Sequence, residues 1–240
     1  MQNRIFSIDS AKAIKAQKYG YLNAIHYLAP SNLSGFQLCP HASAGCIALC
    51  LGWESGQAGM VKHDTDINSV RKSRIDKSRR FMRDRPNYMK DVVRSIELVV
   101  ARAKRMGFKP CIRMNGSSDI AWEGIRHEGK TVFELFPNVA FVDYTKNPKR
   151  FDRALPANYH LTFSRAENNE AQAIALLDRG VNVAIVFAGT KPATWNGFAV
   201  IDGDLHDLRQ LDPRGSQGCI IALSPKGRKA KKDTSGFVIR

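Results

Sequence analysis

The 240-residue chain has few cysteines, few acidic residues and no long apolar run. Its five cysteines are an odd number, so they cannot all pair as internal disulfides. The longest apolar runs, such as residues 183–188, are far too short to cross a bilayer. The first nine residues lack the long apolar stretch of a signal peptide. We therefore expect a cytoplasmic protein with reduced cysteines and no membrane-spanning segment.

Acidic residues are greatly outnumbered by basic ones. The chain has 22 Asp and Glu against 37 Lys and Arg, a formal net charge of +15. Such an excess favours polyanionic partners, with nucleic acid first and an anionic membrane surface second. The alternative is a protein that is simply soluble and basic. No helix-turn-helix or zinc-finger pattern is present, so sequence-specific reading of DNA is not supported.

No repeat or low-complexity block divides the chain, and its hydrophobic content of 43% suffices for a single domain over residues 1–240. Short apolar runs without strict alternation are typical of strands buried on both faces of a parallel sheet. We expect a mainly parallel α/β fold, an irregular or partial (β/α) barrel related to the TIM barrel. An open doubly wound sheet is the alternative. The expected strands lie at residues 21–28, 111–114, 139–142, 159–163, 181–187, 198–201 and 219–223.

A short helix is expected over residues 9–20, and two further segments are expected to be helical. Residues 168–179 form one helix, with Ala171, Ile174, Ala175 and Leu177 facing inward. Residues 66–106 form a basic helical insertion between the first strand and the remaining strands. Its second part carries an apolar stripe at helical spacing, made of Met89, Val92, Val93, Ile96, Val99, Val100 and Ala103.

Basic residues gather in the first part of this insertion and again near the C-terminus. Lys and Arg at this density can neutralise phosphates, which makes both clusters candidates for nucleic-acid binding. A solvated helix face is the alternative explanation. The candidates are Arg71, Lys72, Arg74, Lys77, Arg79, Arg80, Arg83, Lys226, Arg228 and Lys229.

Cys39, Cys46 and Cys50 lie in one short segment directly after the first expected strand. Reduced cysteines this close in sequence are more often metal ligands than disulfide partners. Structural zinc typically uses two cysteine pairs, and the second pair is missing here. A [4Fe–4S] cluster can be held by three cysteines, with one iron left open. We therefore predict such a cluster, with zinc or no metal as alternatives, and expect Cys111 and Cys219 to be buried at the opposite end of the strands.

Polar residues follow several of the expected strands. In parallel α/β folds, functional residues gather at the carboxyl ends of the strands. The candidate catalytic residues are Asp119 and Glu167 as acids or bases, Lys146 and Arg165 as anion clamps, and Asp143 and Tyr144. The candidate cofactor-binding residues are Asn115, Gly116, Ser117, Ser164 and Asp202. The alternative is that these residues only form turns and helix caps.

The cysteine segment, together with residues 113–119 and 143–146, resembles phage and plasmid proteins of the "gene product 88" family. The resemblance covers the chain from about Tyr27 to Phe237 and implies a phage-type protein without a known activity. The layout is also similar to that of radical S-adenosylmethionine enzymes. That resemblance implies that residues 115–117 contact S-adenosylmethionine bound to the open iron. The cysteine spacing here, Cys-x6-Cys-x3-Cys, departs from the Cys-x3-Cys-x2-Cys of that superfamily.

These observations lead to one main hypothesis, an iron–sulfur protein that acts on nucleic acid or on a substrate bound to nucleic acid. Two alternatives stay open. One is a non-catalytic nucleic-acid-binding module in which a metal only fixes the cysteine segment. The other is a metal-independent hydrolase that uses the carboxylates at the strand ends.

Overall fold

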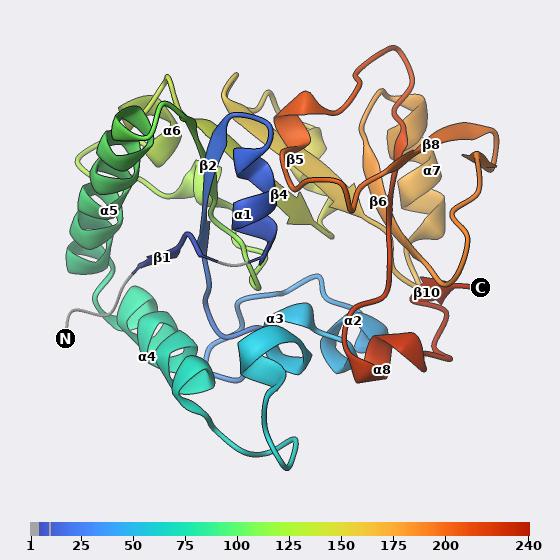
Figure 1. Cartoon of the computed structure of the whole chain (residues 1–240), viewed down its shortest axis with the longest axis horizontal. Helices are drawn as coiled ribbons and strands as arrows, with labels where there is room; N and C mark the ends of the chain where they lie inside the picture. The colour runs from blue at the N-terminus through green and yellow to red at the C-terminus, as the bar shows by residue number, and fades with distance from the viewer. Residues whose placement is uncertain (1–4, 10) are drawn as a thin grey trace.

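The computed structural model describes residues 5–9 and 11–240, so part of the N-terminal stretch considered above lies outside it. In the described residues, ten strands form one sheet with the order β1-β2-β3-β4-β5-β6-β9-β8-β7, and β10 pairs with β6 (Figure 1). The strands are β1 (Phe6–Ser7), β2 (Tyr21–His26), β3 (Lys109–Arg113), β4 (Ala140–Thr145), β5 (Tyr159–Ser164), β6 (Val183–Phe187), β7 (Thr194–Trp195), β8 (Phe198–Asp202), β9 (Ile220–Leu223) and β10 (Val238–Ile239).

The predicted mainly parallel sheet is confirmed, but closure into a barrel is not. The sheet is open, and its strands follow chain order from β2 to β6. The pairings β1–β2 and β7–β8 are antiparallel, and the other pairings are parallel. The two-residue strands β1 and β7 form the edges of the sheet and pair with the outer parallel strands β2 and β8. Because β2 and β8 already have these partners, they do not pair with each other and the sheet stays open.

The helices cover both faces of the sheet and the carboxyl ends of its strands. Ile112 packs with Val92 and Ile96 of α5, whereas the adjacent Cys111 packs with Ala16 of α1. Since neighbouring residues of a strand point to opposite faces, α5 and α1 lie on opposite sides. Figure 1 shows α2, α3, α4 and α8 together below the strands. The helices are α1 (Ala11–Gln17), α2 (Ala44–Ala48), α3 (Leu51–Glu54), α4 (Ser69–Arg83), α5 (Arg85–Arg105), α6 (Val132–Leu135), α7 (Glu170–Asp178) and α8 (Arg228–Lys231).

The basic insertion is two helices, because the chain breaks between α4 and α5 at Asp84, just before Pro86 in the first turn of α5. The predicted apolar stripe of α5 is confirmed, since Met89, Val92, Ile96, Val99 and Ala103 are buried. None of the helices in the described part is long and apolar enough to cross a membrane.

The predicted inner face of α7 is partly wrong. Ala171 and Ala175 are exposed, whereas Ala173, Leu176 and Leu177 are buried against the sheet. The helix turns this face inward because burying two adjacent leucines removes more apolar surface from water than burying two alanines.

The C-terminal strand β10 fills a gap in the sheet. Val186 pairs with Leu223 of β9 and also with Val238, so β9 and β10 lie on opposite edges of β6. Strand β5 shares the β10 edge but pairs with β6 only as far as Ala184. The strands β5 and β6 therefore diverge at their carboxyl ends, and the C-terminus inserts beside them.

Candidate functional site

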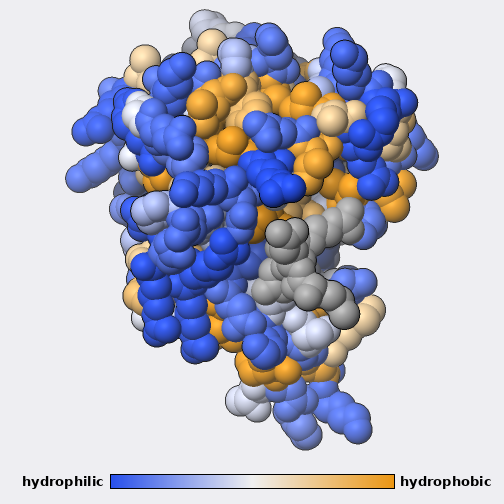
Figure 2. Space-filling model, turned by 90° about the vertical axis from the view of Figure 1, so that its left-hand side faces the viewer, coloured by the Kyte–Doolittle hydropathy of each residue, from blue (hydrophilic) through white to orange (hydrophobic). Residues whose placement is uncertain are grey.

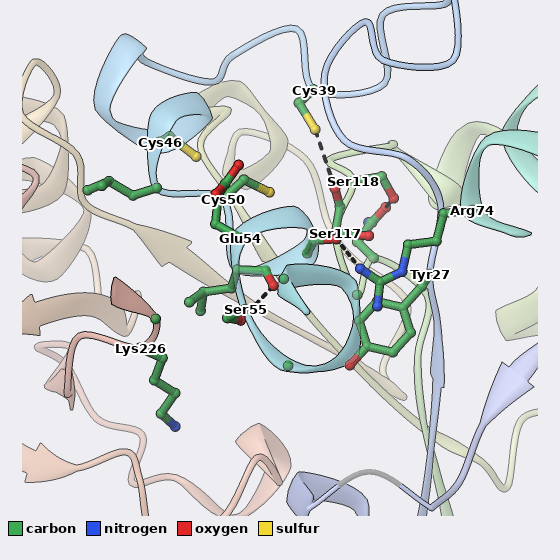
Figure 3. A pocket seen from close by; sticks show the side chains of 18 of the residues that line it. Tyr27, Cys39, Cys46, Cys50, Glu54, Ser55, Arg74, Ser117, Ser118 and Lys226 are labelled. Atoms are coloured by element: carbon green, nitrogen blue, oxygen red, sulfur yellow. Dashed lines mark hydrogen bonds between the residues drawn. The ribbon is translucent and has the colours of Figure 1, made fainter. Parts of the chain in front are cut away.

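A cavity of about 1360 Å³ lies over the carboxyl ends of β2 to β6 and β9. The segment that contains α2, α3 and α4 forms its other wall, together with the start of α8 and Phe237. Figure 3 shows the cysteines at one end of this cavity, with Arg74 stacked on Tyr27 beside them. The strand-end residues that line it are Asn115, Gly116, Ser117, Asp119, Tyr144, Lys146 and Ser164.

The side chains of Cys39, Cys46 and Cys50 all line this cavity. They do not lie on a simple loop after the first strand, because β1 precedes β2, Cys46 belongs to α2, and Cys50 is the N-cap of α3. Burial raises the pKa of Cys39 to about 11 and that of Cys50 to about 12, and it also raises the pKa of Cys46. The negative charges of neighbouring thiolates act in the same direction. The three thiols are therefore neutral near neutral pH.

The other two cysteines lie away from the cavity, and their predicted burial is confirmed. Cys111 is fully buried against Ala16 and Leu208, and Cys219 is buried beside Asn182. His41, a residue type that also binds zinc, is exposed and does not line the cavity.

The donor set at the cavity is three thiols, which are ligands suited to zinc or iron–sulfur clusters. Among the described residues, no group of three or more His, Cys, Asp or Glu side chains could hold a single metal ion.

Close packing fixes the cysteine segment against the strand ends. A Cβ atom on Gly52 of α3 would lie 2.0 Å from the Cβ of Ser117, so only glycine allows this approach. The Ser31 N–H donates to the Cys39 sulfur (3.3 Å), and the Cys39 thiol donates to the Ser117 carbonyl (3.7 Å). Cys39 and α3 are thereby held to the loop after β3.

Glu167, a predicted acid or base, caps the helix that carries Cys46. Its carboxylate accepts hydrogen bonds from the Ser43 hydroxyl and the Gly45 N–H, each at 2.8 Å. Although burial opposes the charge, these bonds hold the pKa of Glu167 below its usual value. Glu167 does not line the cavity, and its geometry is that of a positioning residue.

Asp119 lines the cavity, but both of its oxygens are engaged. One accepts a hydrogen bond from the Lys146 N–H (2.8 Å), and the other pairs with Arg150 (3.2 Å). Arg150 also pairs with Glu123 at 2.6 Å. This network joins the loops after β3 and β4.

Asn115 and Asp143 form the buried support of the loop after β3. Asp143 belongs to β4 instead of following it, is fully buried, and accepts hydrogen bonds from the Asn115 N–H (2.7 Å) and the Tyr159 hydroxyl (3.0 Å). Burial raises the pKa of Asp143 to about 7. The Asn115 side-chain oxygen accepts hydrogen bonds from Ser118, Ile120 and Trp122. Both side chains hold the loop.

Gly116 brings this loop against β2. A Cβ atom there would lie 2.6 Å from the His26 carbonyl oxygen. The close approach explains why glycine occupies the position, apart from any contact with a cofactor.

Two basic side chains accompany the thiols. Lys146 donates to the Ser164 hydroxyl at 2.7 Å. Burial lowers its pKa, while the charges of Cys46 and Asp119 oppose that effect. Arg74 donates to the Gly52 carbonyl and lies 4.5 Å over the Tyr27 ring. Burial lowers the pKa of Arg74, and a charged Cys50 would act against that effect.

The family model for Gene product 88 matches residues 5–240. The chain belongs to the Gene product 88 family. This result confirms the first resemblance drawn from the sequence. None of the curated proteins and none of the solved structures matches the chain, and the resemblance to radical S-adenosylmethionine enzymes is not shown.

In this Gene product 88 protein, the basic residues of α4 divide between its two sides. Arg74 and Lys77 line the cavity, while Arg71 is fully buried and donates to backbone carbonyls of Trp53 and Ala58. The prediction that Arg71 lies on a nucleic-acid-binding surface is therefore wrong, because its guanidinium serves inside the fold. The exposed basic residues of α4 are Lys72, Arg79, Arg80 and Arg83. Figure 2 shows that hydrophilic residues cover much of the face it presents, around a hydrophobic area in its upper part.

The C-terminal basic cluster meets acidic partners in this family member. Lys226 pairs with Asp204 at 2.8 Å, and Lys229 pairs with Glu54 and Asp64 at 2.9 Å each. Lys226, Arg228 and Lys229 all line the cavity.

Two further predicted residues, besides Asp143 and Glu167, lie outside the cavity wall. Arg165 pairs with Glu170 and donates to the Gly236 carbonyl, so it anchors the C-terminal strand. Asp202 pairs with Lys191 at the end of β8.

Sequence reasoning missed several lining residues, including Tyr27, Arg113 and Phe237. One signal was available, because Val70, Ser73, Arg74 and Lys77 share the helical spacing that places them on one face of α4. That face borders the cavity.

Proposed function

We propose that this protein carries a [4Fe–4S] cluster on Cys39, Cys46 and Cys50 and acts on nucleic acid or on a substrate bound to nucleic acid. The observation that carries the proposal is the convergence of these three thiols on one cavity at the strand ends. Cys111 and Cys219 are buried elsewhere and pack as structural residues, so the candidate ligands are the three cysteines at the cavity.

The surroundings of the thiols support metal ligation. Arg74 and Lys146 place positive charge beside Cys50 and Cys46, which favours the thiolates that a metal requires. A bound cluster of this kind would supply one-electron chemistry and an iron without a protein ligand, a position for which S-adenosylmethionine is a candidate occupant. The Cys39 sulfur is hydrogen-bonded to the Ser31 N–H and the Ser117 carbonyl, and Gly52 packs closely against Ser117. These contacts hold the cysteine segment in place.

The basic surface supports a nucleic-acid partner. Lys72, Arg79, Arg80 and Arg83 are exposed along α4, and the chain has an excess of positive charge. Phosphate contacts from such residues do not depend on base sequence. Their place on the helix that also lines the cavity would bring a bound strand close to the thiols.

The metal-independent hydrolase has less support. A hydrolase would need carboxylates free to move protons at the cavity. Asp119 is bound by Lys146 and Arg150, and Glu167 caps α2 outside the cavity wall.

Anaerobic purification followed by absorbance spectroscopy and by iron, sulfide and zinc analysis tests the cluster. We expect iron and acid-labile sulfide in the wild type, their loss in the C39A/C46A/C50A variant, and their retention in the matched C111A/C219A variant. Stoichiometric zinc without sulfide, or no metal in protein that was never exposed to air, would refute the cluster.

The nucleic-acid partner is tested by measuring affinity against salt concentration. The R79Q/R80Q/R83Q variant should bind duplex DNA more weakly, with a log–log salt slope smaller by up to about 3, because each lost phosphate contact contributes about 0.9. A wild-type affinity that does not change with salt would argue against phosphate contacts. Reduction of the cluster without any effect of S-adenosylmethionine on its spectrum would favour the non-catalytic binding module.

A further inference from the structure

Lys77 is a buried cation without a partner. Its side chain is only 7% exposed, yet it borders the cavity. Among the described residues, no hydrogen bond or ion pair reaches its ammonium group, which is not one of the fully buried unpaired atoms and therefore borders the open cavity. Burying an unpaired charge is costly, so such an arrangement is typical of a site completed by an anionic ligand.

Two further donors share its face of α4. Ser73 and Arg74 lie one turn before Lys77 and also line the cavity. Arg74 has no acidic partner among the described residues, and its stacking on Tyr27 fixes the plane of the guanidinium. The three side chains together present two positive charges and a hydroxyl.

The cysteines do not supply the missing anion. Burial lowers the pKa of Lys77 to about 8, and the positive charge of Arg74 lowers it further, with no thiolate acting in the opposite direction. In contrast, the charges of Cys50 and Cys46 act on Arg74 and Lys146. No cysteine is among the groups that shift the pKa of Lys77.

Three carboxylates of the cavity wall do not supply it either. Glu54 and Asp64 pair with Lys229, and Asp119 pairs with Arg150. Each of these acidic groups has a basic partner other than Lys77.

We propose that Ser73, Arg74 and Lys77 bind the phosphate group of a nucleotide inside the cavity. A phosphate carries more negative charge than a single carboxylate and has several acceptor oxygens, which match two cations and a hydroxyl. The inference rests on the proposed function in taking the cavity as the place where the substrate meets the thiols. It goes further by naming a phosphorylated substrate and the wall that holds it.

The test uses metal-free full-length protein at constant ionic strength. Melting temperature and calorimetric affinity are measured with inorganic phosphate, thymidine 5′-monophosphate, thymidine, acetate and a short oligothymidylate. Phosphate and the monophosphate should raise the melting temperature with increasing concentration, whereas thymidine and acetate should not. Stabilisation by acetate or thymidine equal to that by phosphate would overturn the proposal.

The Lys77→Met variant separates binding from a structural role, with Lys90→Met on the exposed face of α5 as the matched control. Without ligand, Lys77→Met should melt at a higher temperature than the wild type, because the unpaired buried charge is gone. Its affinity for phosphate should fall about ten- to hundredfold, as expected for losing a hydrogen bond to a charged group. A lower melting temperature together with unchanged phosphate affinity would refute the site.

Two further measurements locate the ligand and keep this test apart from that of the cluster. Tighter binding of the oligonucleotide than of the monophosphate assigns the phosphate to a nucleic-acid strand, and the reverse assigns it to a free nucleotide. The C39A/C46A/C50A variant should keep its phosphate affinity, because Arg74 is held by the Gly52 carbonyl and the Tyr27 ring and not by a thiol. Absence of a cluster would then refute only the cluster proposal, and absence of phosphate binding would refute only the phosphate site.

Discussion

The Asp143→Asn substitution should remove a pH dependence from the stability of the fold. Asp143 is fully buried and accepts hydrogen bonds from the Asn115 N–H and the Tyr159 hydroxyl. Burial raises its pKa to about 7, although the positive charge of Arg113 opposes the rise. Asparagine has nearly the same shape and can still accept the hydrogen bond from the Asn115 N–H, but it does not titrate.

The sign and size follow from the pKa values of the folded and unfolded chains. The unfolded carboxyl loses its proton near pH 3.8, whereas the folded one keeps it until about pH 7. Between these values the folded state binds more protons, so the free energy of unfolding falls as the pH rises. At about 1.36 kcal/mol for each pH unit, the loss across this window is about 4 kcal/mol, and it levels off above pH 7.

Urea unfolding of the wild type and of Asp143→Asn from mildly acidic to mildly alkaline pH measures this effect. The difference in unfolding free energy between the two proteins should change by several kcal/mol in favour of the variant as the pH rises. Asp178→Asn, at an exposed position of α7, is the control and should follow the wild type. Parallel curves for the wild type and Asp143→Asn would show that Asp143 is charged or neutral in both states alike, and the reasoning would fail.

Three other predictions concern the cavity wall. Gly52→Ala should lower the free energy of unfolding by about 1–3 kcal/mol and weaken metal retention, because its Cβ would overlap Ser117. Gly124→Ala is the control and should change neither, because its Cβ would meet open space. Urea unfolding and metal analysis measure both variants. Glu167→Ala should cost about 0.5–2 kcal/mol in unfolding free energy through loss of the α2 cap, and an unchanged value would contradict that role. Between about pH 8 and pH 10.5, Lys77 keeps its proton in the unfolded chain but not in the folded one, so the wild-type free energy of unfolding should rise with pH. Urea titrations at alkaline pH should show this rise in the wild type and not in Lys77→Met.

The regular elements could be predicted wherever the sequence has a strong period. The stripe of α5 and the apolar runs of the central strands met this condition, and both were found in the structure. The two-residue strands β1, β7 and β10 have no period to detect, so the antiparallel edges and the C-terminal insertion beside β6 were missed. Without these edges, the parallel strands alone suggested a closed barrel.

The candidate site was predicted in part by the rule that strand ends carry function. It placed Ser117, Lys146 and the three cysteines at one cavity. It did not distinguish side chains that face the cavity from those beneath it, because Asp143 lies within a strand and Glu167 turns toward α2. Burial and hydrogen-bond partners decide that distinction, and neither can be read from spacing.

The sequence by itself determined the spacing of Cys39, Cys46 and Cys50, the excess of positive charge and the pattern of apolar strands. These are local or summed properties, which do not depend on how the chain packs. Only the tertiary structure decided that two of the five cysteines are buried elsewhere and that Lys77 faces the cavity without a partner. The cost of a buried charge depends on every group packed around it, and those groups come from distant parts of the chain.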